Sequence, residues 1–240
     1  MQGYKIMTDQ LKRLLSLEWD SRPPDQLGRG GFLTLQSRRL RSRFQDGSHS
    51  PWYELETVFP PFLDAVVLLL FALDSDEIAH IALRRAARPS VALRAQVPEL
   101  ARLDGREWSG ALWELPAGGI EPADLEPGGP GILGRARQEA LEETGLAVEQ
   151  TLFFPLGPSP FSAPAFCPER LHYLAALVEP SQAQPPQGDG HPMEDGAEVR
   201  FLPLDKALEW CGSGRIIDGK TELGLRRLAD WLAQRHTPRS

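Results

Sequence analysis

The feature that most limits how this chain can fold is its longest apolar run, residues 65–73 (AVVLLLFAL). A membrane-spanning helix needs about 20 apolar residues, so this run has roughly half the required length. It is bounded by a turn signal at Asp74-Ser75-Asp76 and therefore predicts a buried strand over residues 64–73. Residues 77–85 (EIAHIALRR) are predicted to return as a second strand.

The composition is sufficient for one sizeable core. A chain of 240 residues with 41% hydrophobic content can form one domain, or one domain with a small appendage. The net charge of -7 argues against binding to duplex nucleic acid, although residues 38–43 (RRLRSR) are locally basic. An acidic protein can still bind a polyanion if a divalent metal bridges the two.

The start of the sequence is polar and charged and lacks the apolar core of a signal peptide. We therefore expect a cytoplasmic protein with no membrane and no nucleic-acid partner. The two cysteines, Cys167 and Cys211, do not have metal-ligand spacing. Buried free thiols are the favoured interpretation and a single disulfide is the alternative.

Periodicity and turn signals divide the chain into a small N-terminal piece, residues 1–60, and a larger part, residues 61–240. In the first piece we predict a helix over residues 9–19, strands over 31–44 and 52–59, and a turn at Asp46-Gly47. In the second, further strands are predicted at 151–156, 170–180 and 199–204, and helices at 135–146, 205–214 and 221–235. Residues 111–119 are predicted to be a short strand running into a glycine loop, and residues 122–134 to be irregular. The chain is therefore predicted to belong to the α+β class.

Three carboxylates are concentrated on the predicted helix at residues 135–146. Glu139, Glu142 and Glu143 stand at offsets 0, 3 and 4, which share nearly one helix face. Such crowding is repulsive unless a hard cation such as Mg²⁺ or Mn²⁺ neutralises it. A solvated acidic face is the ordinary alternative for such a charge run. The nearby glycines of residues 116–119 and Thr144-Gly145-Leu146 favour the metal site, because tight turns let backbone groups approach a metal and phosphates.

Residues 118–146 (GGIEPADLEPGGPGILGRARQEALEETGL) resemble the sequence box of the Nudix hydrolase family, G-x5-E-x7-R-E-U-x-E-E-x-G-U, where U is aliphatic. The C-terminal half matches from Glu139 to Leu146. Asp124 falls at the position of the first box glutamate, and about six extra residues follow it. Gln138 stands where the family has an arginine that braces the catalytic helix, while Arg137 lies one position too early.

The resemblance implies a Nudix α/β/α sandwich with a mixed sheet, preceded by an N-terminal β-rich ribbon. It implies that Glu139, Glu142, Glu143 and the backbone carbonyl of Ala117 bind two or three Mg²⁺ (or Mn²⁺) ions. Glu142 and Glu143 would then be catalytic, in hydrolysis of the pyrophosphate of a nucleoside diphosphate linked to another group. The departure at Gln138 leaves lower activity or a non-catalytic relative as alternatives.

Further features are similar to the ADP-ribose/ADP-sugar pyrophosphatase branch of the family. These are residues 113–118 (WELPAG), the segment 158–178 with Ser159, Pro160 and Glu169, and residues 31–58, which resemble a β-ribbon exchanged between two subunits. The resemblance implies a homodimer acting on a small-molecule nucleoside diphosphate, ADP-ribose or an ADP-sugar first. GDP-sugar, a dinucleoside polyphosphate, coenzyme A or a nucleoside triphosphate is the alternative substrate.

The same branch indicates where substrate groups would bind. Arg88 would contact the diphosphate or ribose, since arginine suits bidentate phosphate contact. Pro160 and Glu169 would shape the pocket, and an aromatic residue such as Trp52, Tyr53 or Phe161 would stack on the base. The general base would come from a late loop, with Glu194 favoured over Asp195 and His191. For each of these residues, a place in the core or on an ordinary surface loop is the alternative.

Overall fold

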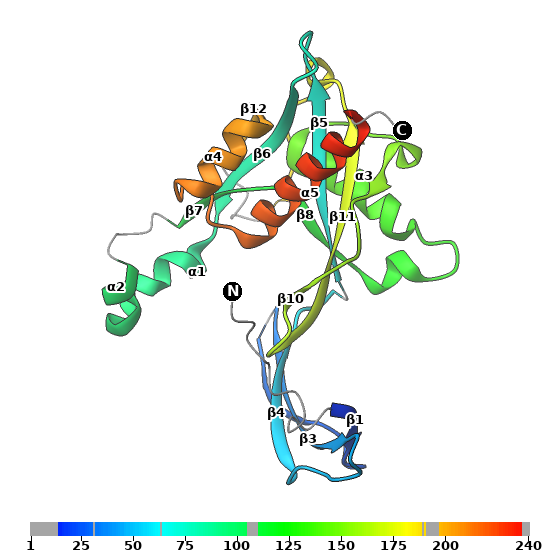
Figure 1. The fold of residues 1–240 in the computed structure, drawn as a ribbon, viewed down its shortest axis with the longest axis vertical. Coiled ribbons are helices and arrows are strands. Elements are labelled where there is room, and N and C mark those ends of the chain that lie inside the picture. The colour runs from blue at the N-terminus through cyan, green and yellow to red at the C-terminus, as the bar shows by residue number, and fades with distance from the viewer. Residues whose placement is uncertain are drawn as a thin grey trace, which may run out of the picture. The chain divides into compact units, whose positions relative to one another are not determined.

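The computed structural model describes residues 14–30, 32–62, 64–104, 110–188, 190 and 197–236. Its contacts divide the chain into two compact units. The N-terminal unit comprises Met1–Pro61 with Ala163–Pro168, and the second unit comprises Phe62–Ser162 with Glu169–Ser240. Each unit is organised around its own sheet (Figure 1).

The N-terminal unit is an antiparallel sheet in which one long strand pairs with the other three. That strand is β3 (Thr34–Phe44), and its partners are β1 (Leu14–Trp19), β2 (Asp25–Arg29) and β4 (Tyr53–Phe59). The strands predicted at 31–44 and 52–59 are thus confirmed. At the predicted turn Gly47 adopts a φ of 82°, and Ser48 donates its backbone N–H to the Asp46 carboxylate at 2.9 Å.

The helix predicted over residues 9–19 is wrong for residues 14–19, which form β1; residues 9–13 lie outside the described part of the chain. The sequence LLSLEW also alternates with a period of two, so Leu15, Leu17 and Trp19 share one face of a strand. From the other face, Glu18 accepts a hydrogen bond from Arg41 Nε on β3 at 2.8 Å. The periodicity of residues 14–19 is compatible with both a helix and a strand, and pairing with β3 selects the strand.

The second unit contains an eight-stranded mixed sheet. Strand β5 (Asp64–Leu73) runs parallel to β11 (Cys167–Leu177) and antiparallel to β6 (Ala79–Ala87), which pairs in turn with β12 (Glu198–Pro203). Shorter strands complete the sheet: β7 (Ala111–Glu114), β8 (Ala117–Ile120), β9 (Phe154–Pro155) and β10 (Phe161–Ala163). The buried strand predicted at residues 64–73 is confirmed.

Helices cover both faces of this sheet, because β5 buries its side chains alternately on the two sides (Figure 1). Val66, Leu68 and Leu70 pack in one cluster with α3 (Gly131–Thr144). Val67, Leu69 and Phe71 pack in another with α4 (Leu204–Gly212) and α5 (Gly219–His236). Each such side chain contributes about 1.5–3 kcal/mol by leaving water. The predicted α/β/α sandwich with a mixed sheet is confirmed.

Short helical elements connect the larger ones. They are α1 (Pro89–Ala92), α2 (Pro98–Asp104), and the 3₁₀ turns η1 (Leu93–Gln96), η2 (Pro122–Leu125), η3 (Gln150–Leu152) and η4 (Pro180–Gln182). Within the described ranges, no helix combines the length and the apolar character needed to cross a bilayer. Cys167 and Cys211 are both free and half-buried rather than fully buried.

Two local predictions around the Nudix-like box need correction. The expected glycine loop of residues 117–119 is part of strand β8, in which Gly118 and Gly119 pair with Val66 and Ala65 of β5. Helix α3 begins at Gly131 rather than at residue 135, so the expected irregular segment is shorter. The helix includes Gly134 although glycine has a low helix propensity. Glycine is required there because a Cβ at this position would lie 2.3 Å from Pro130 Cβ.

Candidate active site

Helix α3 presents two of its three predicted carboxylates to the interior. Glu139 and Glu143 are one helical turn apart and only 9% and 6% exposed, whereas Glu142 is half-buried. The helix ends at Gly145, which adopts a left-handed φ of 71°. A Cβ there would lie 1.7 Å from the carbonyl oxygen of Gln184, so this position of the box accepts only glycine.

Strand β8 brings backbone groups directly against these carboxylates. A Cβ at Gly118 would lie 1.9 Å from Cδ of Glu139, so the carboxyl group occupies the space that any other residue at 118 would fill. The backbone N–H of Ala117 donates to Glu143 Oε2 at 2.8 Å. The structure thus brings Ala117, Glu139 and Glu143 together. Glu142 instead accepts a hydrogen bond from Gln138 Nε2 at 2.9 Å on the exposed side of the helix.

A buried arginine that the sequence did not single out faces this cluster. Arg84 of β6 forms an ion pair with Glu143, and the two side chains are only 3% and 7% exposed. The signal was its place inside a buried strand, since a buried charge needs a partner. Arg84 and Glu143 therefore neutralise each other in the present arrangement.

A second arginine, Arg135, forms hydrogen bonds and ion pairs near the start of helix α3. Its Nε and Nη2 donate to the two Asp124 oxygens at 2.8 and 3.2 Å, and its guanidinium lies 3.2 Å from Glu121 and 3.7 Å from Glu139. Burial alone would lower the pKa of Arg135, but the hydrogen bonds and charge of Asp124, with the charges of Glu121 and Glu139, raise it above its ordinary value.

Gln138, which stands where the family box has arginine, does not contact Asp124, whereas Arg135 does. Arg135 lies three residues before Gln138 and so on nearly the same helix face. Arg137, the other arginine near that position, is exposed. Of these side chains, Arg135 forms the ion pair with Asp124, and Gln138 contacts Glu142.

The donor chemistry of this cluster fits a divalent cation. Glu139 and Glu143 are buried hard-oxygen ligands at i and i+4, next to a glycine strand that lets backbone approach closely. Among the described residues, however, no three His, Cys, Asp or Glu side chains converge in a metal-binding group. Because Glu143 already pairs with Arg84, a cation at this carboxylate would compete with the guanidinium.

Arg88, predicted to contact substrate, lies at the edge of a buried charge cluster. Its Nη2 is 2.5 Å from Glu114 Oε1, and its side chain is 33% exposed against 3% for Glu114. Glu114 also lies 2.8 Å from Lys220 Nζ, which is 2.8 Å from Asp218. Burial would lower the pKa of Lys220, but the charges and hydrogen bonds of Glu114 and Asp218 raise it. These contacts hold Arg88 in position while part of its side chain remains accessible. No sequence pattern indicated that Lys220 belongs to this cluster.

The other predicted substrate contacts are dispersed. Pro160 accepts a backbone hydrogen bond from Leu171 at 2.9 Å, and Glu169 is half-buried on β11. Trp52 belongs to the N-terminal unit and is 38% exposed. The centroid of its ring lies 4.9 Å from the guanidinium carbon of Arg41. The predicted base Glu194, with Asp195 and His191, lies outside the described residues. These roles remain predictions.

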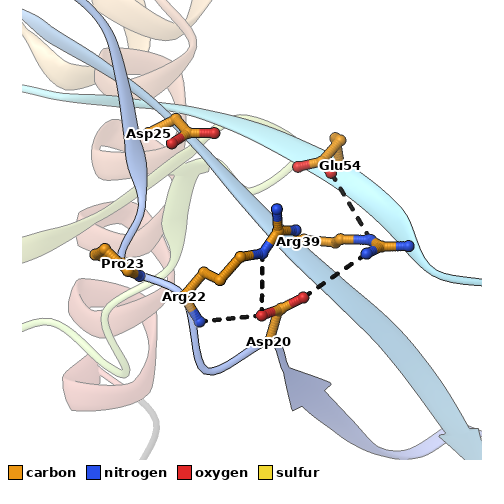
Figure 2. A pocket seen from close by; sticks show the side chains of 6 residues that line it. All are labelled: Asp20, Arg22, Pro23, Asp25, Arg39 and Glu54. Atoms are coloured by element: carbon orange, nitrogen blue, oxygen red, sulfur yellow. Dashed lines mark hydrogen bonds and ion pairs between the residues drawn. The ribbon is translucent and has the colours of Figure 1, made fainter.

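The N-terminal unit contains a cavity of about 180 Å³. Figure 2 shows that most of its charged side chains pair with one another: Asp20 lies 3.2 Å from Arg22 and 3.8 Å from Arg39, which is 4.0 Å from Glu54. Pro23 and Asp25 complete its lining. Among the described residues, none of those predicted for catalysis, metal binding or substrate binding lines this cavity.

Comparison with known proteins agrees with the fold and the carboxylate helix. The model of the NUDIX domain matches residues 74–219, more than half of the chain. The chain is 33% identical over 165 residues to the GDP-mannose pyrophosphatase of Pectobacterium atrosepticum, covering 67% of this chain and 78% of that protein. It is 34% identical over 151 residues to the GDP-mannose pyrophosphatase of Escherichia coli, covering 62% of this chain and 72% of the relative.

A solved structure described as an ADP compounds hydrolase superposes with a TM-score of 0.61, covering 94% of this chain and 99% of the other. Its sequence identity is 15%, so it supports the fold alone. The chain belongs to the Nudix family. The predicted family and enzyme class, a Nudix pyrophosphohydrolase, are confirmed. Nudix enzymes act on small nucleotide-derived substrates and generally require a divalent metal ion.

Proposed function

We propose that this enzyme hydrolyses the diphosphate of a nucleoside diphosphate sugar, releasing a nucleoside monophosphate and a sugar phosphate. The observation that carries the proposal is the pair of buried carboxylates, Glu139 and Glu143, one turn apart beside the backbone of Ala117 and Gly118. The relatives named GDP-mannose pyrophosphatase favour a GDP-sugar as the first substrate to test. ADP-ribose or an ADP-sugar, suggested by the sequence motifs, is the second.

The carboxylates of α3 are proposed to hold Mg²⁺ or Mn²⁺. Glu139 and Glu143 would bind it, with help from Glu142 and the backbone carbonyl of Ala117. A bound divalent cation polarises a phosphoryl oxygen and lowers the pKa of the attacking water. With a cation held by Glu143, the Arg84 guanidinium would be available to the negatively charged diphosphate, to which arginine donates well.

The remaining roles follow from the predicted contacts. Glu194 is proposed as the base that accepts the proton of the attacking water. Arg88 is proposed to donate to the substrate, since Glu114 fixes its guanidinium and its side chain is 33% exposed. Pro160 and Glu169 are proposed to border the group attached to the diphosphate, and Trp52 to stack on the base.

A homodimer with an exchanged N-terminal ribbon completes the proposal. The N-terminal unit exposes several large apolar side chains that a second copy could cover; Leu15, Trp19, Leu27 and Phe32 are each more than half exposed. The oligomeric state is tested by sedimentation of the full chain, for which we expect twice the mass of 26.6 kDa. A monomer at micromolar concentration would refute this part alone.

The function is tested by a substrate panel with product identification. GDP-mannose, ADP-ribose, an ADP-sugar, a dinucleoside polyphosphate, coenzyme A and a nucleoside triphosphate are each incubated with Mg²⁺ or Mn²⁺. We expect a monophosphate and a sugar phosphate from one nucleotide sugar, and no products from Glu143→Gln. Fastest cleavage of a substrate without a sugar group would reject the proposed class, and turnover of none would favour a non-catalytic ligand sensor.

A further inference from the structure

Four polar residues of the second unit form a closed ring of hydrogen bonds apart from the carboxylate cluster. Ser159 Oγ lies 3.0 Å from His172 Nδ1, and His172 Nε2 lies 2.9 Å from Asp64 Oδ2. The backbone N–H of Arg170 donates to Asp64 Oδ1 at 3.0 Å. The Arg170 guanidinium donates to the carbonyl oxygen of Ser159 at 2.8 and 3.1 Å. Ser159 is thus held through both its backbone and its hydroxyl.

The direction of these hydrogen bonds fixes the polarity of the serine hydroxyl. An ionised carboxylate only accepts, so His172 must carry its proton on Nε2 to bond Asp64. In the neutral imidazole Nδ1 is then an acceptor, and the Ser159 hydroxyl must donate to it. The remaining lone pairs of Ser159 Oγ can only accept, so the serine hydroxyl presents an acceptor and not a donor.

The ring lies on the same face of the sheet as the catalytic carboxylates. His172 precedes Leu174 by two residues, and Leu174 packs in the cluster that contains Ala136 and Ala140 of α3, so both point toward this helix. His172 pairs with Val66 on β5, and Val66 pairs with Gly118 on β8, against which Glu139 rests. Two strand spacings, about 10 Å, therefore separate His172 from Gly118.

The ring is also open to solvent. The Asp64 and His172 side chains are 29% and 23% exposed, and Ser159 is half-buried. A tether between the loop and β11 does not need these side chains, because the backbone of Leu171 already donates to the carbonyl of Pro160 at 2.9 Å. The Ser159 and His172 side chains are therefore available for a role besides holding the loop.

We propose that Ser159, oriented by His172 and Asp64, accepts a hydrogen bond from a hydroxyl of the sugar attached to the diphosphate. This inference rests on the proposed function and makes it more specific. A sugar hydroxyl can donate to the oriented oxygen, whereas a fully ionised phosphate offers only acceptors. Ser159 thus selects a polyhydroxylated group over a terminal phosphate or an alkyl group.

The test compares two ligands that carry the same charge. One is the nucleotide sugar cleaved fastest in the panel, or GDP-mannose if none is cleaved; the other is the methyl ester of the same nucleoside diphosphate, which lacks sugar hydroxyls. Ser159→Ala is expected to lower kcat/KM for the nucleotide sugar about tenfold, as expected for one hydrogen bond, and to change the methyl ester less than about twofold. Ser162→Ala, in the neighbouring strand β10, is the matched control and should change neither.

Asp64→Asn provides an isosteric check of the polarity. An asparagine amide can donate to Nε2, which moves the imidazole proton to Nδ1 and turns Ser159 into a donor toward the substrate. We expect the same selective loss as for Ser159→Ala, with an unchanged circular dichroism spectrum. In the wild-type protein, nitrogen NMR of neutral His172 should place the proton on Nε2, and a proton on Nδ1 would overturn the proposal.

The remaining outcomes are equally decisive. An equal loss for both ligands in Ser159→Ala and Asp64→Asn means that the ring only supports the loop, and no loss for either means that Ser159 does not contact the substrate. If wild-type protein cleaves neither ligand, the proposed function fails, and calorimetry with the same ligands decides the subsite. A tenfold weaker affinity of Ser159→Ala for the sugar ester alone supports it, whereas equal affinities or no binding refute it.

Discussion

Replacing Arg135 by methionine should both destabilise the enzyme and slow it. The Arg135 and Asp124 side chains are 9% and 5% exposed and share two hydrogen bonds. Removing one partner of a buried ion pair leaves the other charge unpaired and costs about 3–5 kcal/mol. With a urea dependence of about 2 kcal/mol/M for a small domain, the unfolding midpoint should fall by about 2 M.

Urea unfolding followed by circular dichroism measures this loss, with Arg137→Met as the matched control. Arg137 stands on the same helix but is exposed, so its substitution should change the unfolding free energy by less than about 0.5 kcal/mol. Adding Asp124→Leu to Arg135→Met should recover part of the stability, because the unpaired buried carboxylate is then absent. Turnover of Arg135→Met should fall at urea-free conditions, since Glu139 loses the guanidinium 3.7 Å away.

Two results would refute this reasoning. If Arg135→Met and Arg137→Met unfold at the same urea concentration, the Arg135 ion pairs do not stabilise the helix. If Arg135→Met is destabilised but keeps full turnover, the Arg135 ion pairs stabilise the fold but do not orient Glu139.

Further changes test the rest of the site. Glu142→Gln and Glu143→Gln should each lower turnover by orders of magnitude in a folded protein, and unfolding of either variant would assign it a structural role instead. Gln138→Arg should not raise turnover, because Arg135 already donates to both oxygens of Asp124. A faster enzyme would show that the contacts of Arg135 do not fully hold helix α3 in place. Gly118→Ala should abolish turnover, since its Cβ would displace the Glu139 carboxyl group, and normal kinetics would show that the strand can move. Burial raises the pKa of Tyr173 to about 12, above the ordinary value near 10, so folding holds this proton more tightly. The unfolding free energy should therefore decline between about pH 10 and 12, and Tyr173→Phe should reduce the decline.

The sequence predicted the parts of the fold that depend on strong local patterns. The buried strand at residues 64–73 and the helix containing Glu139 and Glu143 were predictable because apolar runs and helix spacing are encoded locally. Residues 14–19 were assigned to a helix because their leucines satisfy both periods, and only pairing with β3 distinguishes them. The glycines of strand β8 likewise predicted a loop, because the strand depends on hydrogen bonds to β5.

The limits of prediction at the site have the same origin. The carboxylates could be found because all three stand on one helix. Their counterions could not, because Arg84 comes from β6, 59 residues away from Glu143, and Arg135 is identifiable as a brace only when Asp124 is seen beside it. The ring around His172 joins positions as much as 108 residues apart, and no local spacing indicates it.

The internal pairing of these charges affects when the protein can fold. Arg84 pairs with Glu143, and Arg135 pairs with Asp124 and Glu139, so each of these buried carboxylates has a cationic partner without an added ion. We therefore expect the free energy of unfolding to be the same with and without a divalent cation. Urea unfolding in the presence of a chelator should give the same midpoint as in its absence.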